Sequence, residues 1–249
     1  MTAKPPARDP ADANAVAHVF VEALDDRCEM TGADGHHLQR VRRLAPGEMV
    51  TAADGSGAWR GYEVIEVATG RLTLEARDDL QFACAPRVAV SLAVALTKGG
   101  LDDVVAAVTE LGVGRVTPVR TSRAVVRWDE GRARRAVARL RSVARASAMQ
   151  SRRARIPIVD EVVALSAIVE RSGLVVAARD GVLASQLPAP GDDGWTVLVG
   201  PEGGLAPDEL AALESAPRLR LGPHVLRTST APAAAVAVLS AEAARLLPE

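Results

Sequence analysis

The sequence Thr196-Val-Leu-Val-Gly-Pro-Glu-Gly-Gly-Leu205 determines how the rest of the chain is interpreted. Its first half is apolar and β-branched, has the length of a buried strand, and ends in a Gly-Pro-Glu-Gly-Gly loop. Pro207-Asp-Glu-Leu210 then opens a helix, because proline is tolerated at the first helical position and two acids favour the positive end of the dipole. Residues 200–206 should therefore lie at the carboxyl end of a strand, where open α/β sheets bind ligands. Gly203 and Gly204 lack a Cβ, so a ligand can approach the main chain there.

A second glycine turn, Leu221-Gly-Pro-His-Val-Leu-Arg-Thr-Ser-Thr-Ala231, follows shortly afterwards and leads into a helix. We interpret the two loops as walls of one pocket. The chain has no GxGxxG after a strand and no GxxxxGK[ST], so a dinucleotide oxidoreductase and a P-loop NTPase both lose their main sequence support. Taken alone, the first loop could also be an ordinary strand-to-helix turn.

From Val88 onward, short apolar runs alternate with helical patterns, which indicates an α/β sheet. The arginine-rich helix should turn Val137, Leu140 and Val143 inward. We expect strands at 88–96, 115–119, 174–178, 196–199 and 219–221, and helices at 101–111, 130–149, 161–171 and 230–247.

The N-terminal third has the alternating pattern of half-buried strands, which predicts a small β-barrel-like domain. The strands are expected at 19–21, 49–52, 61–67 and 71–76, separated by turns at Pro46-Gly47, Asp54-Gly55 and Thr69-Gly70. A short helix is expected at 35–44. Residues 1–15 should be frayed, and residues 78–87 should form a linker.

Positive charge is concentrated in one part of the chain, although the net charge is only −1. Residues 120–155 contain twelve arginines and only two acids, Asp129 and Glu130. Such a block is typical of a protein that binds RNA or DNA. The alternative is a solvated helix face in an arginine-rich protein.

Length and composition limit the remaining possibilities. The chain has 249 residues, 48% of them hydrophobic, and no apolar run approaches the roughly 18 residues that span a bilayer. Lys4, Arg8 and three prolines near the N-terminus are unlike a secretory signal, so we expect a cytoplasmic protein without membrane association. Cys28 and Cys84 should be free, and no metal site is expected, because adjacent His36 and His37 would point to different sides of a helix.

The paired loops and several separated motifs together resemble the RsmE family of 16S ribosomal RNA (uracil-N3)-methyltransferases, within the SPOUT superfamily. The resemblance implies a PUA-like RNA-binding β-barrel domain at 16–80 and an α/β domain with a trefoil knot at 87–249. The knot rests on the resemblance alone, since ordinary topology rules exclude it. The motifs are His36-His-Leu with Val41 and Arg43, Pro46-Gly47, Asp54-Gly55, Lys98, Glu110-Leu-Gly-Val113, Pro118, Ser122-Arg123, Gln150-Ser151, Pro157 and the two C-terminal loops.

The family implies S-adenosylmethionine (SAM) as cofactor, 16S rRNA in the 30S subunit as partner, and a homodimer. Arg227 is the side chain we place in the active site, with an outer salt bridge as the alternative. The expected cofactor-binding residues are Leu198, Val199, Gly200, Pro201, Glu202, Gly203, Gly204, Leu221, Gly222, Val225 and Leu226. The expected RNA-binding residues are His36, His37, Arg40, Arg43, Arg120, Arg123 and Arg127.

The sequence departs from the family pattern at four positions. His18 and His224 stand where arginines are usual, Met149 where a glutamate precedes Gln150-Ser151, and Ser229 where a glutamate separates two threonines. These departures concern side-chain roles and leave the glycines of both loops unchanged.

The resemblance thus implies a SAM-dependent enzyme that methylates N3 of a specific uridine in 16S rRNA. Arg227 would stabilise the anion that develops on the uracil, and the identity of a general base stays open. Glu202 could be catalytic, or it could brace the loop or complement a helix dipole. The alternatives are a SPOUT enzyme that methylates a ribose 2′-hydroxyl of RNA, and an RNA-binding ribosome-assembly factor without catalysis. Trp59, Trp128 and Trp195 are expected in the core, with Trp128 a candidate for stacking on a base.

Overall fold

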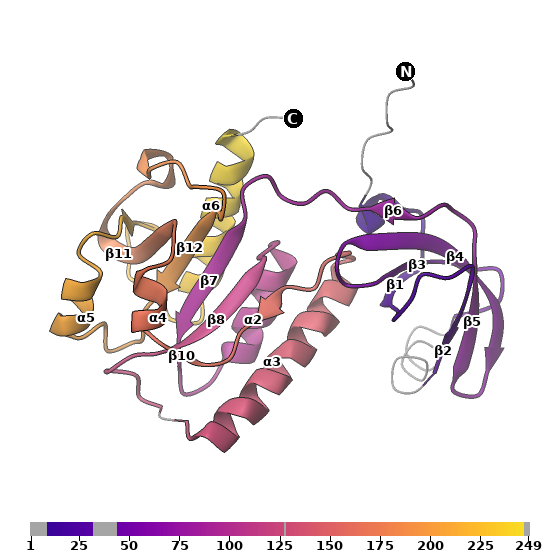
Figure 1. The fold of residues 1–249 in the computed structure, drawn as a ribbon, viewed down its shortest axis with the longest axis horizontal. Helices are drawn as coiled ribbons and strands as arrows, with labels where there is room; N and C mark the ends of the chain where they lie inside the picture. The colour runs from indigo at the N-terminus through magenta and orange to yellow at the C-terminus, as the bar shows by residue number, and fades with distance from the viewer. Residues whose placement is uncertain (1–8, 32–43, 127, 247–249) are drawn as a thin grey trace. The chain divides into compact units, whose positions relative to one another are not determined.

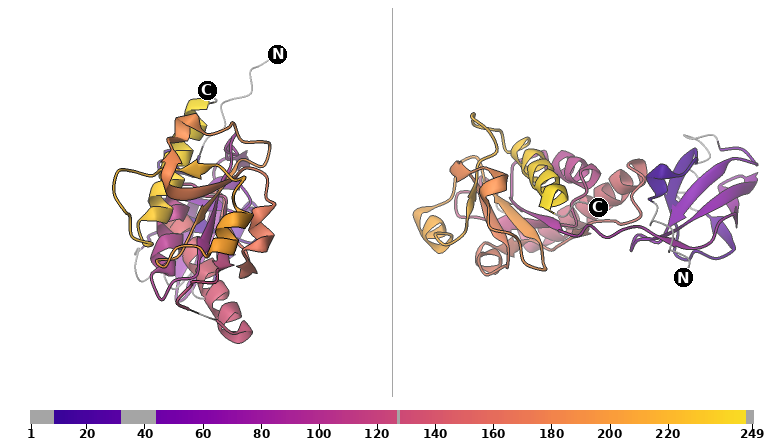
Figure 2. Two further views of the ribbon diagram at one scale, coloured as in Figure 1. Left: turned by 90° about the vertical axis from the view of Figure 1, so that its left-hand side faces the viewer. Right: turned by 90° about the horizontal axis from the view of Figure 1, so that it is seen from above.

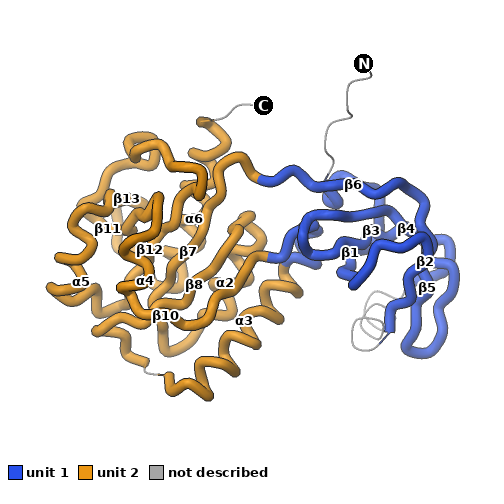
Figure 3. The backbone as a smooth tube through the Cα atoms, viewed as in Figure 1, with its two compact units in different colours: residues 1–85, 148–156 blue, residues 86–147, 157–249 orange. Residues whose placement is uncertain are grey.

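The computed structural model describes residues 9–31, 44–126 and 128–246 (Figure 1). The chain divides into two compact units, each considered by itself (Figure 3). Unit 1 comprises residues 1–85 and 148–156, and unit 2 comprises residues 86–147 and 157–249. The segment 148–156 lies within the range that the sequence assigns to the C-terminal domain, but it packs in unit 1.

Unit 1 is a six-stranded, mainly antiparallel sheet with the order β1-β3-β4-β5-β2, and β6 pairs with β4. Only β1 and β3 run parallel. The strands β1 and β2 lie at opposite ends of this order, and a closed barrel would require them to pair. The predicted β-barrel therefore stays a prediction. The elements are η1 (Pro10–Asp12), β1 (Ala17–Phe20), β2 (Arg27–Met30), β3 (Met49–Ala53), β4 (Ala58–Ala68), β5 (Arg71–Ala76) and β6 (Gln81–Phe82).

Alternation along these strands places one side of the sheet in an apolar core around Val19, Val50, Tyr62 and Leu72. A second cluster holds the segment 148–156 in the unit, because Ala148 and Ala154 pack with Phe20, Ala53, Trp59 and Ala83.

Unit 2 contains a seven-stranded sheet in which every pair of strands is parallel. The order is β10-β8-β7-β12-β11-β13, and β9 also pairs with β8. The strands are β7 (Val90–Ala95), β8 (Arg115–Arg120), β9 (Ile158–Val159), β10 (Val163–Ala164), β11 (Leu174–Val182), β12 (Trp195–Val199) and β13 (Arg218–Leu219). The helices are α2 (Leu101–Glu110), α3 (Glu130–Gln150), α4 (Ser166–Val169), η3 (Ala184–Gln186), α5 (Pro207–Ala212) and α6 (Ala231–Leu246).

Helices cover both faces of this sheet, so its central strands are apolar throughout. All five residues of β12 are buried. On one face, α2 and α6 pack together, and α6 contacts β7 and β12 (Figure 2). On the other, Ile168 of α4 and Leu213, next to α5, join a core cluster with Ala93 and Leu198. The sheet therefore presents its strand ends, rather than its faces, to a ligand.

Most expected elements are confirmed, and the errors concern short ones. The predicted helix at 161–171 is wrong in its first half, because Val163–Ala164 forms β10 and only Ser166–Val169 is helical. The predicted linker contains β6, and β2 was missed. The segment before Val16 is not simply frayed, since η1 has an Asp9 cap. Val143 is half-buried, and Ala144 takes its expected place in the buried stripe of α3.

Three smaller expectations can also be compared with the structure. Cys28 is buried and Cys84 exposed, and both are free. Trp59 and Trp195 are core residues, whereas Trp128 is half-buried. The predicted helix at 35–44 lies almost entirely outside the described residues. Among the described helices, none is both long and apolar enough to cross a membrane.

Candidate functional site

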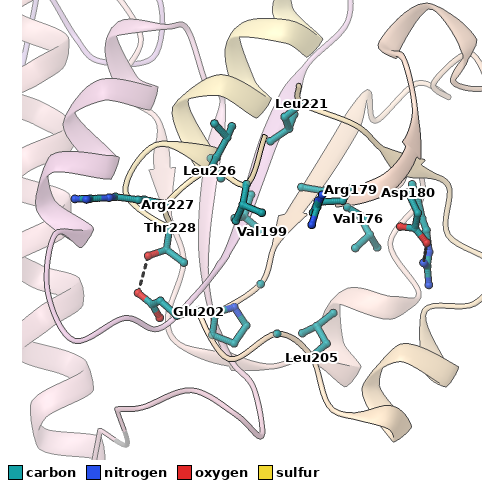
Figure 4. Close-up of a pocket in the computed structure, with 18 of the residues that line it drawn as sticks. Val176, Arg179, Asp180, Val199, Glu202, Leu205, Leu221, Leu226, Arg227 and Thr228 are labelled. Atoms are coloured by element: carbon teal, nitrogen blue, oxygen red, sulfur yellow. Dashed lines mark hydrogen bonds and ion pairs between the residues drawn. The ribbon is translucent and has the colours of Figure 1, made fainter. Parts of the chain in front are cut away.

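A cavity of about 640 Å³ lies in unit 2, outside the carboxyl ends of β11, β12 and β13 (Figure 4). Both glycine loops line it, together with the end of β11. The volume is within the range of small-molecule and cofactor sites. The interpretation of the two loops as walls of one pocket is therefore confirmed.

Nearly all the residues predicted to bind a cofactor line this cavity, and two do not. Leu198 is fully buried in the core cluster beneath it, because alternate residues of β12 face opposite sides. Gly203 packs against Arg123 instead, where a Cβ would come within 3.4 Å of the Arg123 carbonyl oxygen. The lining residues that the sequence identified are Val199, Gly200, Pro201, Glu202, Gly204, Leu221, Gly222, Val225, Leu226 and Arg227.

The first loop is held in a fixed turn. The Gly204 N–H donates to the Pro201 carbonyl at 2.9 Å, and Gly204 has φ +69°, which favours glycine. Pro207 then opens α5, and Oε2 of the buried Glu209 accepts from the Ala206 N–H at 2.8 Å. These contacts fix the direction in which the loop leaves the strand.

The second loop keeps its main-chain donors free. Among the described residues, no N–H group from Leu221 to Ser229 donates a hydrogen bond within the protein. Buried or ligand-facing N–H groups are strong donors that require a partner. The loop is tied to the first one through a side chain, because the Thr228 hydroxyl donates to Glu202 Oε1 at 2.6 Å (Figure 4).

The sequence missed one wall of the cavity, residues 176–180 at the end of β11. Val176 gives this wall an apolar base, and Asp180 forms an ion pair with Arg218 at 2.5 Å. The signal was available, since a strand was predicted at 174–178 and ligands bind at strand ends. His224 and Thr228 also line the cavity and had not been assigned to the cofactor.

The two ends of the cavity differ in character. We call Glu202, Arg227 and Thr228 the Glu202 end; Asp180 lies at the opposite end (Figure 4). Arg227 is exposed, and its side chain extends away from the cavity rather than into it (Figure 4). Val176, Leu205 and Leu213 are buried apolar residues of the intervening wall. Such a cavity can hold a molecule with an apolar or aromatic part while leaving one end open to a charged substrate.

A third loop, residues 121–123 after β8, borders the Glu202 end. The Ser122 N–H donates to Glu209 Oε1 at 2.7 Å, and Arg123 Nη1 lies 3.4 Å from the Gly203 carbonyl oxygen. Glu209 therefore connects this loop to residue 206 through its two oxygens.

The predicted RNA-binding residues are only partly described. Arg120 and Arg123 are exposed in unit 2, whereas His36, His37, Arg40, Arg43 and Arg127 lie outside the described residues. On α3, three exposed arginines have acidic partners: Arg134 with Glu130, Arg139 with Asp102, and Arg141 with Glu161.

The four departures from the family pattern lie in different environments. His18 is buried in unit 1, and burial lowers its pKa to about 4. Its Nε2 donates to the Arg153 carbonyl at 3.1 Å, so Nδ1 accepts from the Thr51 hydroxyl at 2.8 Å. Met149 packs against the second core cluster of unit 1. His224 and Ser229 are exposed.

Comparisons with known proteins match both units. A family model described as RNA methyltransferase domain matches residues 84–240, and one described as RNA methyltransferase PUA domain matches residues 30–76. Ribosomal RNA small subunit methyltransferase E of Mycobacterium bovis is 37% identical over 233 residues, which cover 87% of this chain and 88% of that protein. The Bacillus subtilis protein of the same name is 26% identical over 89% of this chain and 94% of its own.

A solved structure shares the fold. Ribosomal RNA small subunit methyltransferase E from Neisseria gonorrhoeae, bound to S-adenosyl methionine, superposes with a TM-score of 0.81 at 22% identity. The match covers 91% of this chain and 97% of that one.

Proposed function

The chain belongs to the RNA methyltransferase family, and on this premise we propose that it methylates N3 of a uridine in 16S rRNA, with SAM as the methyl donor. The observation that carries the proposal is the cavity at the strand ends, which both glycine loops line. SAM binding in the gonococcal relative and the names of the relatives support the cofactor and the class of substrate.

The cavity fits such a cofactor in shape and in chemistry. A Cβ built on Gly204 or Gly222 would meet nothing within 4 Å, so both glycines border open space. The free N–H groups of residues 221–229 can donate to ring nitrogens, while Val176, Leu205 and Leu226 offer apolar contacts. Bound there, SAM would supply an electrophilic methyl group on its sulfonium.

The residues of the Glu202 end then act on the substrate rather than on the cofactor. Arg227 extends out of the cavity from its rim (Figure 4). We propose that the target base approaches there. A guanidinium there would favour the negative charge that spreads over a uracil ring when N3 loses its proton. Holding the base in line with the methyl group supplies a further part of the barrier reduction.

Positive charge outside the cavity would bind the rRNA backbone. Arg120 and the exposed arginines of α3 are the described part of this surface, and His36, His37, Arg40, Arg43 and Arg127 complete the set we propose. The PUA match of residues 30–76 supports an RNA role for unit 1. Such contacts weaken as salt is added, because binding releases counterions.

The oligomeric state and the topology belong to the same proposal. We propose that the protein acts as a homodimer on the 30S subunit in the cytoplasm, with a trefoil knot in unit 2. Gel filtration with light scattering tests the dimer directly, since a monomer at micromolar concentration would contradict it.

The test of the activity is methyl transfer in vitro. The protein is incubated with SAM carrying a labelled methyl group and with undermethylated 30S subunits, and the rRNA is digested and mapped by mass spectrometry. We expect labelled N3-methyluridine at one position. A label on a ribose 2′-oxygen would overturn the assignment of the target atom, and tight RNA binding without transfer would overturn the enzyme.

A further inference from the structure

The loop after β8 provides an arginine, separate from Arg227, that contacts the first glycine loop next to Glu202. Arg123 is exposed, and its guanidinium contacts the main chain of the first glycine loop at Gly203. Gly203 follows Glu202, which receives the hydrogen bond from Thr228. Arg123 therefore contacts the residue next to Glu202 in the first glycine loop.

The position of Arg123 is set by a buried carboxylate. Glu209 is only 8% exposed. One of its carboxylate oxygens accepts a hydrogen bond from the Ser122 N–H, and the other accepts one from the Ala206 N–H. Charge-assisted hydrogen bonds of this kind are stronger than neutral ones. They hold the loop of Arg123 and the first glycine loop in one geometry before any substrate binds.

Two side chains of the loop after β8 keep hydrogen-bond donors available to a ligand. Among the described residues, Arg123 has no carboxylate partner, and its hydrogen bond to the Gly203 carbonyl is long at 3.4 Å. The Thr121 hydroxyl, two residues earlier, is buried without a hydrogen-bond partner. Arginines 134, 139 and 141 of α3 differ, because each already pairs with an acid.

We infer that Arg123 contacts the target uracil in the transition state, with Glu209 as its positioning residue; this inference rests on the proposed function. In the transfer, N3 gives its proton to hydroxide from solvent, and the electron pair left on N3 forms the bond to the methyl carbon. The pair of the breaking S–CH₃ bond stays on sulfur. Negative charge on O2, N3 and O4 is greatest before the new bond forms, and the planar fork of a guanidinium can donate to such oxygens.

The experiment separates a contact with the base from a contact with a phosphate. Arg123→Gln and Arg123→Lys are compared with Arg134→Gln, which removes an exposed arginine of α3 that pairs with Glu130. For each protein, kcat and KM with undermethylated 30S subunits, the pH profile of kcat, the calorimetric affinity for SAM and the salt dependence of RNA binding are measured.

For Arg123→Gln we expect kcat to fall about 100-fold, the size typical of losing one donor to a developing anion. KM, SAM affinity and the salt slope should stay within about twofold, and the rise of kcat should shift to higher pH because the N3 anion loses its cation. Arg123→Lys should recover part of the rate. A Glu209→Gln variant should lower kcat less, with the profile shifted in the same direction.

An unchanged kcat for Arg123→Gln, with a higher KM and a salt slope reduced by about one, would overturn the inference and make Arg123 a phosphate contact. Arg134→Gln should show that second pattern or no change. Wild-type protein that forms N3-methyluridine while Arg123→Gln keeps its full kcat contradicts only the inference. Wild-type protein that transfers no methyl group contradicts the proposed function, and the inference falls with it.

Discussion

The inner walls of the cavity consist of main chain and apolar side chains, whereas the Glu202 end consists of charged and hydroxyl side chains. Val176, Leu205 and Leu213 are buried, and the second loop offers unpaired N–H groups. At the Glu202 end, Arg227 is exposed and Thr228 bonds to Glu202. We propose a division of tasks on this basis, in which the inner walls bind the cofactor and the Glu202 end acts on the substrate.

The largest effect should come from a side chain added to the inner wall. Gly204→Val places a branched side chain at φ +69° and fills open space beside the cavity. Backbone strain of about 1–3 kcal/mol and the steric conflict together should weaken SAM binding at least 100-fold. Calorimetric titration measures this, with RNA binding expected to be unchanged.

Gly203→Ala is the matched control for that variant. Its Cβ would meet Arg123 atoms at 3.4 and 3.6 Å and would not enter the cavity. SAM affinity should therefore change by less than about threefold. Equal losses in Gly203→Ala and Gly204→Val would show that the loop as a whole is sensitive, rather than its cavity-facing side.

The next effect tests the Glu202 end. Arg227→Gln should lower kcat about 100-fold and leave SAM affinity nearly unchanged, because the side chain extends away from the cavity. Steady-state kinetics on 30S subunits and calorimetry give the two quantities. Loss of SAM binding in this variant would contradict the proposal that the inner walls bind the cofactor and the Glu202 end acts on the substrate.

The smallest effect should come from the residue that joins the two regions. Thr228→Val keeps the shape but removes the hydroxyl that donates to Glu202 at 2.6 Å. A hydrogen bond to a charged group contributes about 1.5–3 kcal/mol, so SAM affinity should fall roughly tenfold or somewhat more as the second loop loosens. Thr228→Ser, which keeps the donor, should bind SAM almost normally. If both variants bind equally well, the bond between the loops has no role in holding the cofactor.

The same contrast explains what the sequence could predict. The inner walls depend on glycines after a β-branched run, a local pattern that is visible along ten residues from Thr196 to Leu205. The first loop was predicted for this reason, whereas the second has its own glycine turn, and most lining residues were assigned through the family resemblance. The prediction that Leu198 faces the cavity was wrong. Every residue of β12 is buried, so no alternation of polar and apolar residues shows which side of the sheet each side chain faces.

The missed features depend on contacts between residues distant in the sequence. Glu209 resembles an ordinary first-turn acid of α5, and only the structure shows that it also accepts from Ser122, 87 residues away. The strand predicted at 174–178 pointed to the wall at 176–180, but the ion pair of Asp180 with Arg218, 38 residues away, has no local signal. The segment 148–156 begins within the last turn of α3, so its packing in unit 1 has no signal in the sequence. The strand β10 is only two residues long, which is too short for a periodic pattern of apolar residues to reveal it in the sequence.

The central claim is that this cavity binds the methyl donor, and calorimetric titration of SAM into wild-type protein and Gly222→Val tests it most directly. The Gly222 backbone is not in the left-handed region, and its Cβ would meet only open space beside the cavity, so valine adds bulk without backbone strain. We predict saturable binding to the wild-type protein and at least a 100-fold loss in Gly222→Val, with the same thermal unfolding midpoint for both proteins without ligand. Equal SAM affinity in the two proteins would contradict the assignment of the cavity.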